Sequence, residues 1–564
     1  MFASSEMIDP SRLKRSALIF LIGLALVLAV ALPEIRKSIN AQQDTRAASS
    51  SIEQSGDESR NAFAPSQASA PGSASRAARQ LQEEIDRVID ESEFASARWG
   101  VYASSLRDGR TLYARNAGEL FTPASNMKVY TTAVALDLLG ANYRWRTSVY
   151  AAAPPDAGGA IAGDITLYGR GAPDLVSRSK KNKEASPSLA SLADALYERG
   201  VRRVRGNVVG DESYFRGEPL GDGWLWTDVQ WYFGAEVSAL SIDDNALTLQ
   251  ITPAARFDEP ATITSDDAAQ RYVRVTNDAN TVARGARSSV GVTRGLSDNE
   301  IRVWGEFPAG TAPLRVRLAM HNPALIAAQL FRDALLARGI KVEGEALARD
   351  ARGRSDLRFD PQGATELASA LSGTLGEIAR ATNKESINLN AELILRTLGK
   401  ERDAPFENQS TKTSAAESSK KRLRGSDEAG LATVRTWLER AGIATKQLAL
   451  HDGCGLSRLD LVTPEATARL LAAMTRSSAA TVFRDSLPIA GRDGTLQSRL
   501  RVAQNRIEAK TGTLTYIHTL SGYATTADGE PIVFAIFCND ETAKASSTPI
   551  IDAIAARLAA YHRN

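Results

Sequence analysis

The sequence predicts an α/β (α+β) protein whose main domain is interrupted by a large β-rich insertion. Three observations lead to this fold class. Residues 127–139 are apolar almost without a polar stripe and stop at Gly140, which predicts a buried helix. Short segments of alternating polarity then dominate to about residue 360, as is typical of strands. Helical patterns return from Leu367 onward, and the chain ends in further alternating runs.

The 564 residues divide into four parts by composition and periodicity, and they are enough for more than one domain. The parts are a leader, a linker rich in Ser, Ala and Gln, a main domain in two segments, and the β-rich insertion. The predicted boundaries are 1–33 for the leader, 34–80 for the linker, 81–145 with 361–564 for the main domain, and 146–360 for the insertion.

The leader has the parts of a secretory signal peptide. Arg12, Lys14 and Arg15 precede an uncharged apolar run, 17–32, that contains the small-residue site Ala29-Val30-Ala31. Because this run is short for a spanning helix of roughly 20 residues, an uncleaved N-terminal membrane anchor is the alternative. Both interpretations predict that the rest of the chain is exported to the periplasm or another extracytoplasmic compartment.

The remaining elements follow from periodicity and turn residues. An amphipathic helix is predicted from Ser75 into the main domain, followed by two strands joined at Asp108-Gly109. The insertion is predicted to hold one amphipathic helix at 322–340 and strands at 148–153, 164–169, 201–210, 246–252, 271–277 and 301–307.

In the second segment of the main domain, the polar stretch 381–386 separates two helical patterns, and 399–426 is predicted to be an exposed loop. Thr463-Pro464 has the residue types that begin a helix. Asp528-Gly529 marks a hairpin near the C-terminus.

Composition excludes several kinds of function. The 68 basic and 66 acidic residues give a net charge of +2, so no strong global field favours nucleic acid as a partner. The four histidines and two cysteines, Cys454 and Cys538, lack the spacing of metal ligands. We therefore expect neither a metal nor another cofactor, and a disulfide between the two cysteines stays open.

A nucleophile and its base are predicted at the start of the buried helix. Ser125 and Lys128 are three residues apart, so they share a helix face and the amine can reach the hydroxyl. A serine hydroxyl needs an adjacent base to attack, and a lysine serves only if burial lowers its pKa from about 10.4 toward 7. The same spacing recurs at Ser177–Lys180 and Ser418–Lys421, but in charged stretches typical of solvated surface.

Two further motifs follow in order along the chain. Ser386-Ile387-Asn388 lies at the predicted helix junction, and Lys510, Thr511, Gly512 and Thr513 lie on a predicted strand. Glycine in that strand allows a backbone to approach closely. A competing Ser-x-Asn at Ser297 sits between two strand-like runs, where Asp-Asn is typical of a hairpin turn.

The ordered set resembles the penicillin-recognising serine enzymes, and most closely the class C low-molecular-mass penicillin-binding proteins, the D-alanyl-D-alanine carboxypeptidase/endopeptidase family. The resemblance extends over about residues 80–564. It also rests on the long insertion and on GDESYF at 210–215, the aromatic run at 223–245 and DGCGLSRLDLVTP at 452–464. It implies a serine β-lactamase/transpeptidase-like fold for the main domain.

The resemblance implies the roles of the motif residues. Ser125 would form an acyl-enzyme with the penultimate D-Ala of a peptidoglycan stem peptide, with Lys128 as its base. Ser386 would relay a proton to the leaving amine. Substrate would be bound by Asn388, Lys510, Thr511, Gly512 and Thr513, and the backbone N–H groups of Ser125 and Thr513 would form the oxyanion hole. β-Lactam antibiotics would bind covalently to the same serine.

The family also lines a pocket for the side-chain amine of the stem peptide. Asp228 and Phe233 match that pattern, and Arg458 is assigned to the same region. A surface acid or helix cap is the alternative for Asp228. The chain departs from the family in having Cys454 where serine is usual.

Two other functions stay open from sequence. A β-lactamase or esterase shares the acylation residues, although the large insertion with Asp228 favours a peptidoglycan substrate. A non-catalytic cell-wall binding protein is the second alternative, but binding alone requires neither a nucleophile nor a base. The sequence leaves the oligomeric state, the third residue of the stem peptide, and the balance of carboxypeptidase and endopeptidase action undecided.

Overall fold

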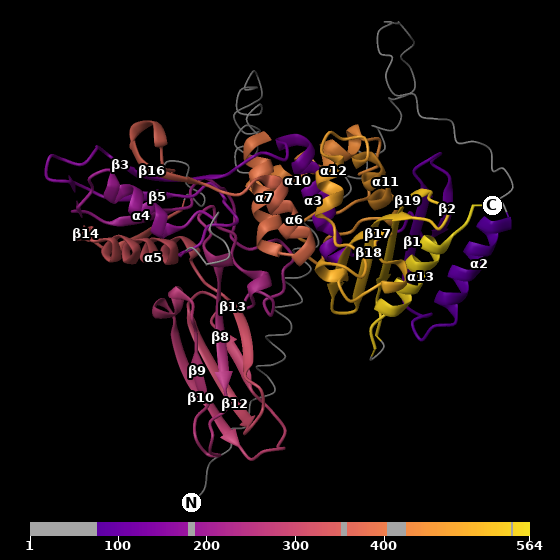
Figure 1. Cartoon of the computed structure of the whole chain (residues 1–564), viewed down its shortest axis with the longest axis horizontal. Coiled ribbons are helices and arrows are strands. Elements are labelled where there is room, and N and C mark those ends of the chain that lie inside the picture. The colour runs from indigo at the N-terminus through magenta and orange to yellow at the C-terminus, as the bar shows by residue number, and fades with distance from the viewer. Residues whose placement is uncertain (1–75, 179–185, 351–357, 403–424, 543–544, 564) are drawn as a thin grey trace, which may run out of the picture. The chain divides into compact units, whose positions relative to one another are not determined.

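The computed structural model describes residues 76–178, 186–350, 358–402, 425–542 and 545–563 (Figure 1). The predicted leader, and the linker up to residue 75, lie outside these ranges. The first helix, α2 (Arg76–Asp90), begins within the stretch that we assigned to the linker. Among the described helices, none combines the length and the apolar character needed to cross a bilayer.

A five-stranded antiparallel sheet forms the centre of the main domain, with the order β17-β18-β19-β1-β2. It joins the two chain segments on either side of the insertion. The strands are β1 (Arg98–Ser105), β2 (Thr111–Arg115), β17 (Ile507–Leu514), β18 (Ile517–Thr525) and β19 (Pro531–Asn539). The predicted turns at Asp108-Gly109 and Asp528-Gly529 connect β1 to β2 and β18 to β19.

Strand β19 shows why both faces of this sheet are covered by helices. Its residues are buried from Ile532 to Asn539, and alternate side chains enter two different hydrophobic clusters. One face packs against α2 and α13 (Thr548–Ala560). The other packs against α11 (Pro464–Met474) and enters a cluster shared with α3 (Met127–Leu139), α6 (Leu375–Glu385), α7 (Asn388–Arg402), α10 (Ser426–Arg440) and α12 (Ala480–Ser486) (Figure 1).

In the part of the insertion that the structure describes, four small sheets and two α-helices surround a separate hydrophobic cluster. One sheet is β15-β7-β5-β3-β16, and three-stranded sheets have the orders β14-β6-β4, β13-β8-β9 and β10-β12-β11. The elements are β3 (Arg146–Ala151), β4 (Ala160–Ile161), β5 (Ile165–Tyr168), α4 (Leu189–Glu198), β6 (Arg203–Val204), β7 (Val208–Asp211), β8 (Ala246–Thr252), β9 (Thr262–Thr264), β10 (Arg274–Val282), β11 (Gly291–Arg294), β12 (Glu300–Pro308), β13 (Leu314–Ala319), α5 (Pro323–Arg338), β14 (Lys341–Val342), β15 (Ala346–Arg349) and β16 (Thr365–Leu371).

The expectation of a helix from Leu367 was wrong for its first residues. Residues 365–371 form β16, which pairs antiparallel with β3, so the sheet of the insertion extends beyond residue 360. The helix begins only after Thr374, whose hydroxyl and the Glu377 carboxylate form a capping box. Pairing with β3 therefore outweighed the helical propensity of the Leu-Ala-Ser-Ala-Leu run.

Two smaller expectations are also resolved by the structure. Residues 399–402 are the last turn of α7, and residues 403–424 of the predicted loop lie outside the described ranges. Cys454 and Cys538 are both buried and free, so they form no disulfide. They lie in separate hydrophobic clusters.

Candidate active site

Ser125 lies in the short 3-10 turn η1 (Ala124–Asn126), directly before α3. Ala124 has φ of 48°, in the left-handed region that residues with a Cβ rarely adopt, and Ser125 is half-buried. The Asn126 amide fixes this turn to the sheet because it donates to Thr519 Oγ1 on β18 at 2.6 Å. Lys128 Nζ lies 2.9 Å from Ser125 Oγ, as the spacing predicted.

Lys128 is fully buried and has two further partners. Its Nζ donates to Asn388 Oδ1 at 2.7 Å and to the Cys454 carbonyl at 2.8 Å. Burial lowers the pKa of this amine, while the nearby Cys454, Asp452 and Glu392 oppose the shift. In the neutral amine two N–H bonds serve the two carbonyl oxygens, which leaves the lone pair for the hydroxyl of Ser125.

Ser386 occupies the junction between α6 and α7 with φ of 59°. Lys510 on β17 donates from Nζ to Ser386 Oγ at 3.0 Å and to the Thr511 carbonyl at 2.6 Å. Burial, and secondarily the charge of Lys128, hold the pKa of Lys510 well below its ordinary value. The second and third motifs therefore meet at one pair of side chains.

Asn388, the first residue of α7, connects the first motif to the insertion. Its Oδ1 accepts from Lys128, and its Nδ2 donates to the carbonyl of Phe233 at 2.8 Å. Phe233 also packs against the small cluster of Ala391, Cys454 and Leu456. The insertion thus reaches the site through the backbone of Phe233, a contact that sequence reasoning missed.

Gly512 allows β17 to lie against the turn that carries Ser125. An ideal Cβ at this position would lie 2.2 Å from Thr519 Oγ1 and 2.8 Å from the carbonyl oxygen of Pro123. The close backbone approach predicted for this glycine is therefore confirmed. Thr513, the next residue, is exposed.

Arg458 contacts the residue that follows β17, and its charge acts on Asp228. Arg458 donates from Nη1 to the carbonyl of Thr515 at 3.3 Å. Burial raises the pKa of the half-buried Asp228, and the charge of Arg458 opposes this shift. Their predicted role in holding substrate, like that of Phe233, stays a prediction.

The sequence analysis missed Thr495, whose Oγ1 accepts a hydrogen bond of 2.8 Å from Thr511 Oγ1. Thr495 belongs to the turn Gly494–Leu496, which follows Asp493. Lys384 anchors this turn because its Nζ donates to both carboxylate oxygens of Asp493 at 2.7 and 2.8 Å. The Asp493-Gly494 pair, typical of a turn, was the available signal.

Thr495→Val is expected to weaken the binding of carboxylate ligands about 5-fold with little change in the rate of acylation. Valine keeps the shape but removes the acceptor that orients the Thr511 hydroxyl, and a neutral hydrogen bond is worth about 1 kcal/mol. The dissociation constant of penicillin before acylation measures the effect. Thr436→Val, at an exposed position of α10, is the matched control. An unchanged dissociation constant would show that Thr495 does not orient Thr511 for binding.

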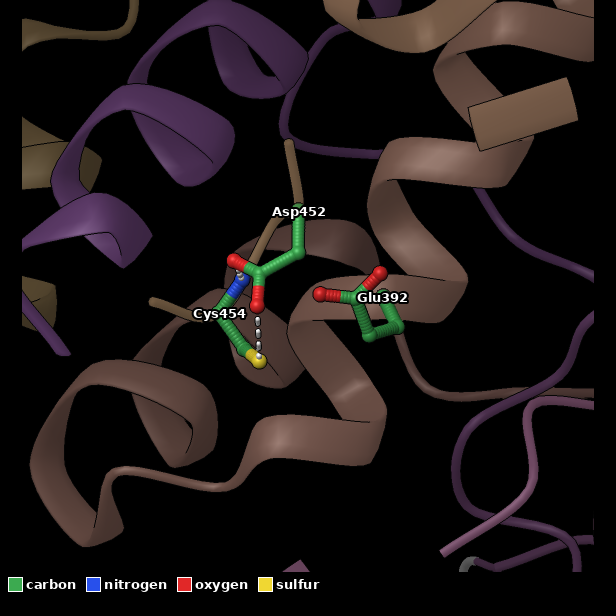
Figure 2. Close-up of side chains that lie close together, drawn as sticks. All are labelled: Glu392, Asp452 and Cys454. Atoms are coloured by element: carbon green, nitrogen blue, oxygen red, sulfur yellow. Dashed lines mark hydrogen bonds between the residues drawn. The ribbon is translucent and has the colours of Figure 1, made fainter. Parts of the chain in front are cut away.

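Beneath the site, three buried side chains that could ligate a metal gather with their donor atoms within 4.8 Å of one another, namely Glu392, Asp452 and Cys454 (Figure 2). Backbone N–H groups already occupy the carboxylate oxygens of Asp452, and Glu392 accepts from the N–H of Gly453 at 2.7 Å. Burial raises the pKa of Glu392 to about 8, so this carboxyl is protonated at neutral pH. The cluster is accordingly a hydrogen-bonded structural centre.

Comparison with known proteins identifies the family. A model of the D-Ala-D-Ala carboxypeptidase 3 (S13) family matches residues 81–561. The chain belongs to this family. It is 34% identical over 495 residues to the D-alanyl-D-alanine carboxypeptidase of Actinomadura sp. (strain R39), which covers 86% of this chain and 85% of that protein. It is 25% identical to the D-alanyl-D-alanine carboxypeptidase DacB of Haemophilus influenzae, over 80% of this chain and 88% of that protein.

The fold is also found among solved structures. The crystal structure of penicillin binding protein 4 from Haemophilus influenzae superposes with a TM-score of 0.70 at 23% identity, covering 84% of this chain and 98% of that one. A second structure of that protein contains a β-lactam. The predicted family, the penicillin-binding-protein fold and the class of serine-type D-Ala-D-Ala carboxypeptidase are thereby confirmed.

Proposed function

We propose that this protein hydrolyses the D-Ala-D-Ala end, and D-Ala cross-links, of peptidoglycan stem peptides through an acyl-enzyme on Ser125, and that penicillin acylates the same residue. The observation that carries the proposal is the position of the buried Lys128 amine. It lies 2.9 Å from Ser125 Oγ, and it donates hydrogen bonds to two other acceptors, Asn388 Oδ1 and the Cys454 carbonyl. Such an amine is a base and not merely a cation.

In the acylation step, Ser125 Oγ attacks the carbonyl carbon of the penultimate D-Ala while its proton passes to Lys128 Nζ. The backbone N–H groups of Ser125 and Thr513 stabilise the resulting oxyanion. The tetrahedral intermediate collapses when the C–N bond breaks. Ser386, hydrogen-bonded to Lys510, relays the proton taken up by Lys128 to the departing amine, so that both residues return to their starting states, and D-Ala leaves.

In the second step, water attacks the ester carbonyl of the acyl-enzyme and the bond to Ser125 Oγ breaks. A proton of the attacking water passes through Lys128 to the serine oxygen, and the shortened stem peptide leaves with a new carboxyl group. When the acyl group comes from penicillin, the thiazolidine part stays attached and this step is slow. A persistent adduct follows.

The buried Lys510 gives the site a means of selecting a terminal carboxylate. Its amine has a hydroxyl and a carbonyl as partners, and burial disfavours its charged form. An arriving carboxylate supplies the counter-charge, so binding is coupled to the uptake of a proton by Lys510. We place this reaction outside the cytoplasm, because the N-terminal residues have the pattern of an export signal and peptidoglycan lies there.

The proposal is tested by labelling the full-length protein with fluorescent penicillin and locating the adduct by mass spectrometry. We expect a long-lived adduct on Ser125 that is absent from Ser125→Ala, together with release of D-Ala from a pentapeptide stem. In intact cells, a penicillin conjugate that does not cross the inner membrane should label the same serine.

Other outcomes would contradict the proposal in identifiable ways. Rapid turnover of penicillin without a lasting adduct would indicate a β-lactamase. An adduct on another serine would remove Ser125 from its role, and a folded protein without an adduct would favour a non-catalytic wall-binding protein. Labelling in lysed but not in intact cells would contradict export.

A further inference from the structure

A turn outside the three motifs lies between the helices that carry two of them. This turn, residues 452–457, contacts α3, whose second residue is Lys128, and α7, which begins with Asn388. Lys128 and Asn388 lie 260 residues apart in sequence, yet their side chains are 2.7 Å apart. This short distance requires a fixed spacing between α3 and α7, and the turn contacts both helices.

Toward α3, the turn contacts the base and the residue before the nucleophile. The Gly453 carbonyl accepts from Thr131 Oγ1 at 2.7 Å, and the Cys454 carbonyl accepts from Lys128 Nζ at 2.8 Å. An ideal Cβ at Gly455 would lie 1.7 Å from the carbonyl oxygen of Ala124. Gly455 also has φ of +81°, so glycine is required there for two reasons.

Toward α7, the turn packs one helical turn beyond Asn388. The Gly453 N–H donates to Glu392 Oε1 at 2.7 Å, and Glu392 is four residues after Asn388 on the same helix face. An ideal Cβ at Gly453 would lie 2.9 Å from the Cβ of Leu395 and 3.0 Å from the carbonyl of Ala391. The backbone of the turn therefore packs directly against both helices.

Asp452 organises this backbone. Its Oδ1 accepts from the N–H groups of Cys454 at 3.0 Å and Gly455 at 2.5 Å. Its Oδ2 accepts from the N–H of Ser457 at 2.7 Å and from Trp224 Nε1 at 2.9 Å. Four N–H donors thus converge on one buried carboxylate, and one of them belongs to the insertion.

We propose that Asp452 is a positioning residue for Lys128: it holds the 452–457 turn so that the Cys454 carbonyl fixes the amine toward Ser125. The indole of Trp224 extends this arrangement into the insertion. The inference rests on the proposed function, because it concerns the base of that reaction. Asp452 makes no described hydrogen bond to Ser125 or Lys128, so it positions the amine through the turn, while its charge also opposes the lowering of the Lys128 pKa.

Proton transfer from Ser125 depends on the direction in which the lone pair of the Lys128 amine points. A neutral amine has two N–H bonds and one lone pair, and the lone pair points at Ser125 only while both N–H bonds have fixed acceptors. Asn388 supplies one acceptor and Cys454 supplies the other. If the turn shifts, the amine rotates, and the lone pair no longer faces the hydroxyl although every motif residue remains present.

The test uses Asp452→Asn in the full chain, with the penicillin dissociation constant and the acylation rate at saturation measured separately. Asparagine keeps the size but replaces one acceptor oxygen with an NH₂ group that faces N–H donors. We expect the acylation rate to fall about 30-fold while the dissociation constant changes less than 3-fold. Hydrogen exchange at residues 454–457 should become at least 10-fold faster.

Asp211→Asn is the matched control, because Asp211 is a buried aspartate in the sheet of the insertion that accepts from Ser213 and Arg349. It is expected to lose stability without slowing acylation. If Asp452→Asn does not fold, Thr131→Val removes the hydroxyl that docks Gly453 on α3 and should slow acylation about 5-fold.

The outcomes separate this inference from the proposed function. Absence of a Ser125 adduct in the parent protein would reject the proposed function, and hydrogen exchange at 454–457 would still report on whether Asp452 holds the turn. A parent that acylates while folded Asp452→Asn acylates equally fast would overturn the inference alone. A rise in the dissociation constant with an unchanged acylation rate, or an equal loss in Asp211→Asn, would also overturn it.

Discussion

Lys128→Met is expected to slow acylation of Ser125 by penicillin about 10²- to 10⁴-fold, the range that a general base contributes. Methionine has a similar length and fits a buried site, but it cannot accept the serine proton. The amine that it replaces lies 2.9 Å from Ser125 Oγ and is fully buried, with its pKa lowered by that burial. The second-order rate constant of acylation by fluorescent penicillin measures the effect.

Lys128→Arg separates a base from a mere positive charge. Arginine keeps the charge but stays protonated in proteins, so it should be as inactive as Lys128→Met. Thermal unfolding monitored by circular dichroism checks that both variants fold. Activity in Lys128→Arg within 10-fold of the parent would mean that Lys128 acts through its charge, and the assignment of the base would then be wrong.

The sequence predicted those parts of the site that depend on local spacing. Ser125 and Lys128 are neighbours because they are three residues apart at the start of a helix, and Ser386 lies at a helix junction because a polar stretch interrupts two apolar patterns. The close approach of Gly512 also followed from its residue type. Local geometry of this kind can be predicted from the sequence without knowledge of the fold.

Contacts between distant segments could not be predicted from the sequence in the same way. Thr495 binds Thr511, 16 residues along the chain, and Asp452 binds Trp224 of the insertion, 228 residues away. The backbone carbonyl of Phe233 carries no side-chain signature at all. Residues 367–371 of strand β16 were mistaken for helix because only the pairing with β3 makes this segment a strand. In each case the deciding interaction is tertiary.

The buried carboxyl of Glu392 shows how such tertiary contacts alter chemistry in a measurable way. Glu392 is 1% exposed, and its pKa is raised to about 8 by burial and by the adjacent charge of Asp452. Below pH 4.5 the group is protonated in both the folded and the unfolded chain, so its titration costs nothing. Between pH 4.5 and about 8 the unfolded chain ionises first, and the folded state loses stability as the pH rises.

Glu392→Gln should remove this pH-dependent cost. Glutamine keeps an oxygen that can accept from Gly453, and its amide does not titrate. Since each pKa unit is worth about 1.4 kcal/mol, the free energy of unfolding of the variant, relative to the parent, should increase by roughly 4 kcal/mol between pH 5 and pH 8. Urea unfolding followed by tryptophan fluorescence at the two pH values measures this difference.

Glu465→Gln, in which a carboxylate paired with Arg469 on the surface of α11 is replaced, controls for the substitution itself. Its effect should differ by less than about 1 kcal/mol between the two pH values, because exposed ion pairs contribute little. Infrared difference spectra between the parent and Glu392→Gln should show a carboxylic acid band that disappears with a midpoint near pH 8. A carboxylate band already present at pH 6, with a pH-independent stability difference, would mean that Glu392 is ionised in the folded protein. The Asp452 turn would then rest on two adjacent buried charges, an arrangement that burial strongly disfavours.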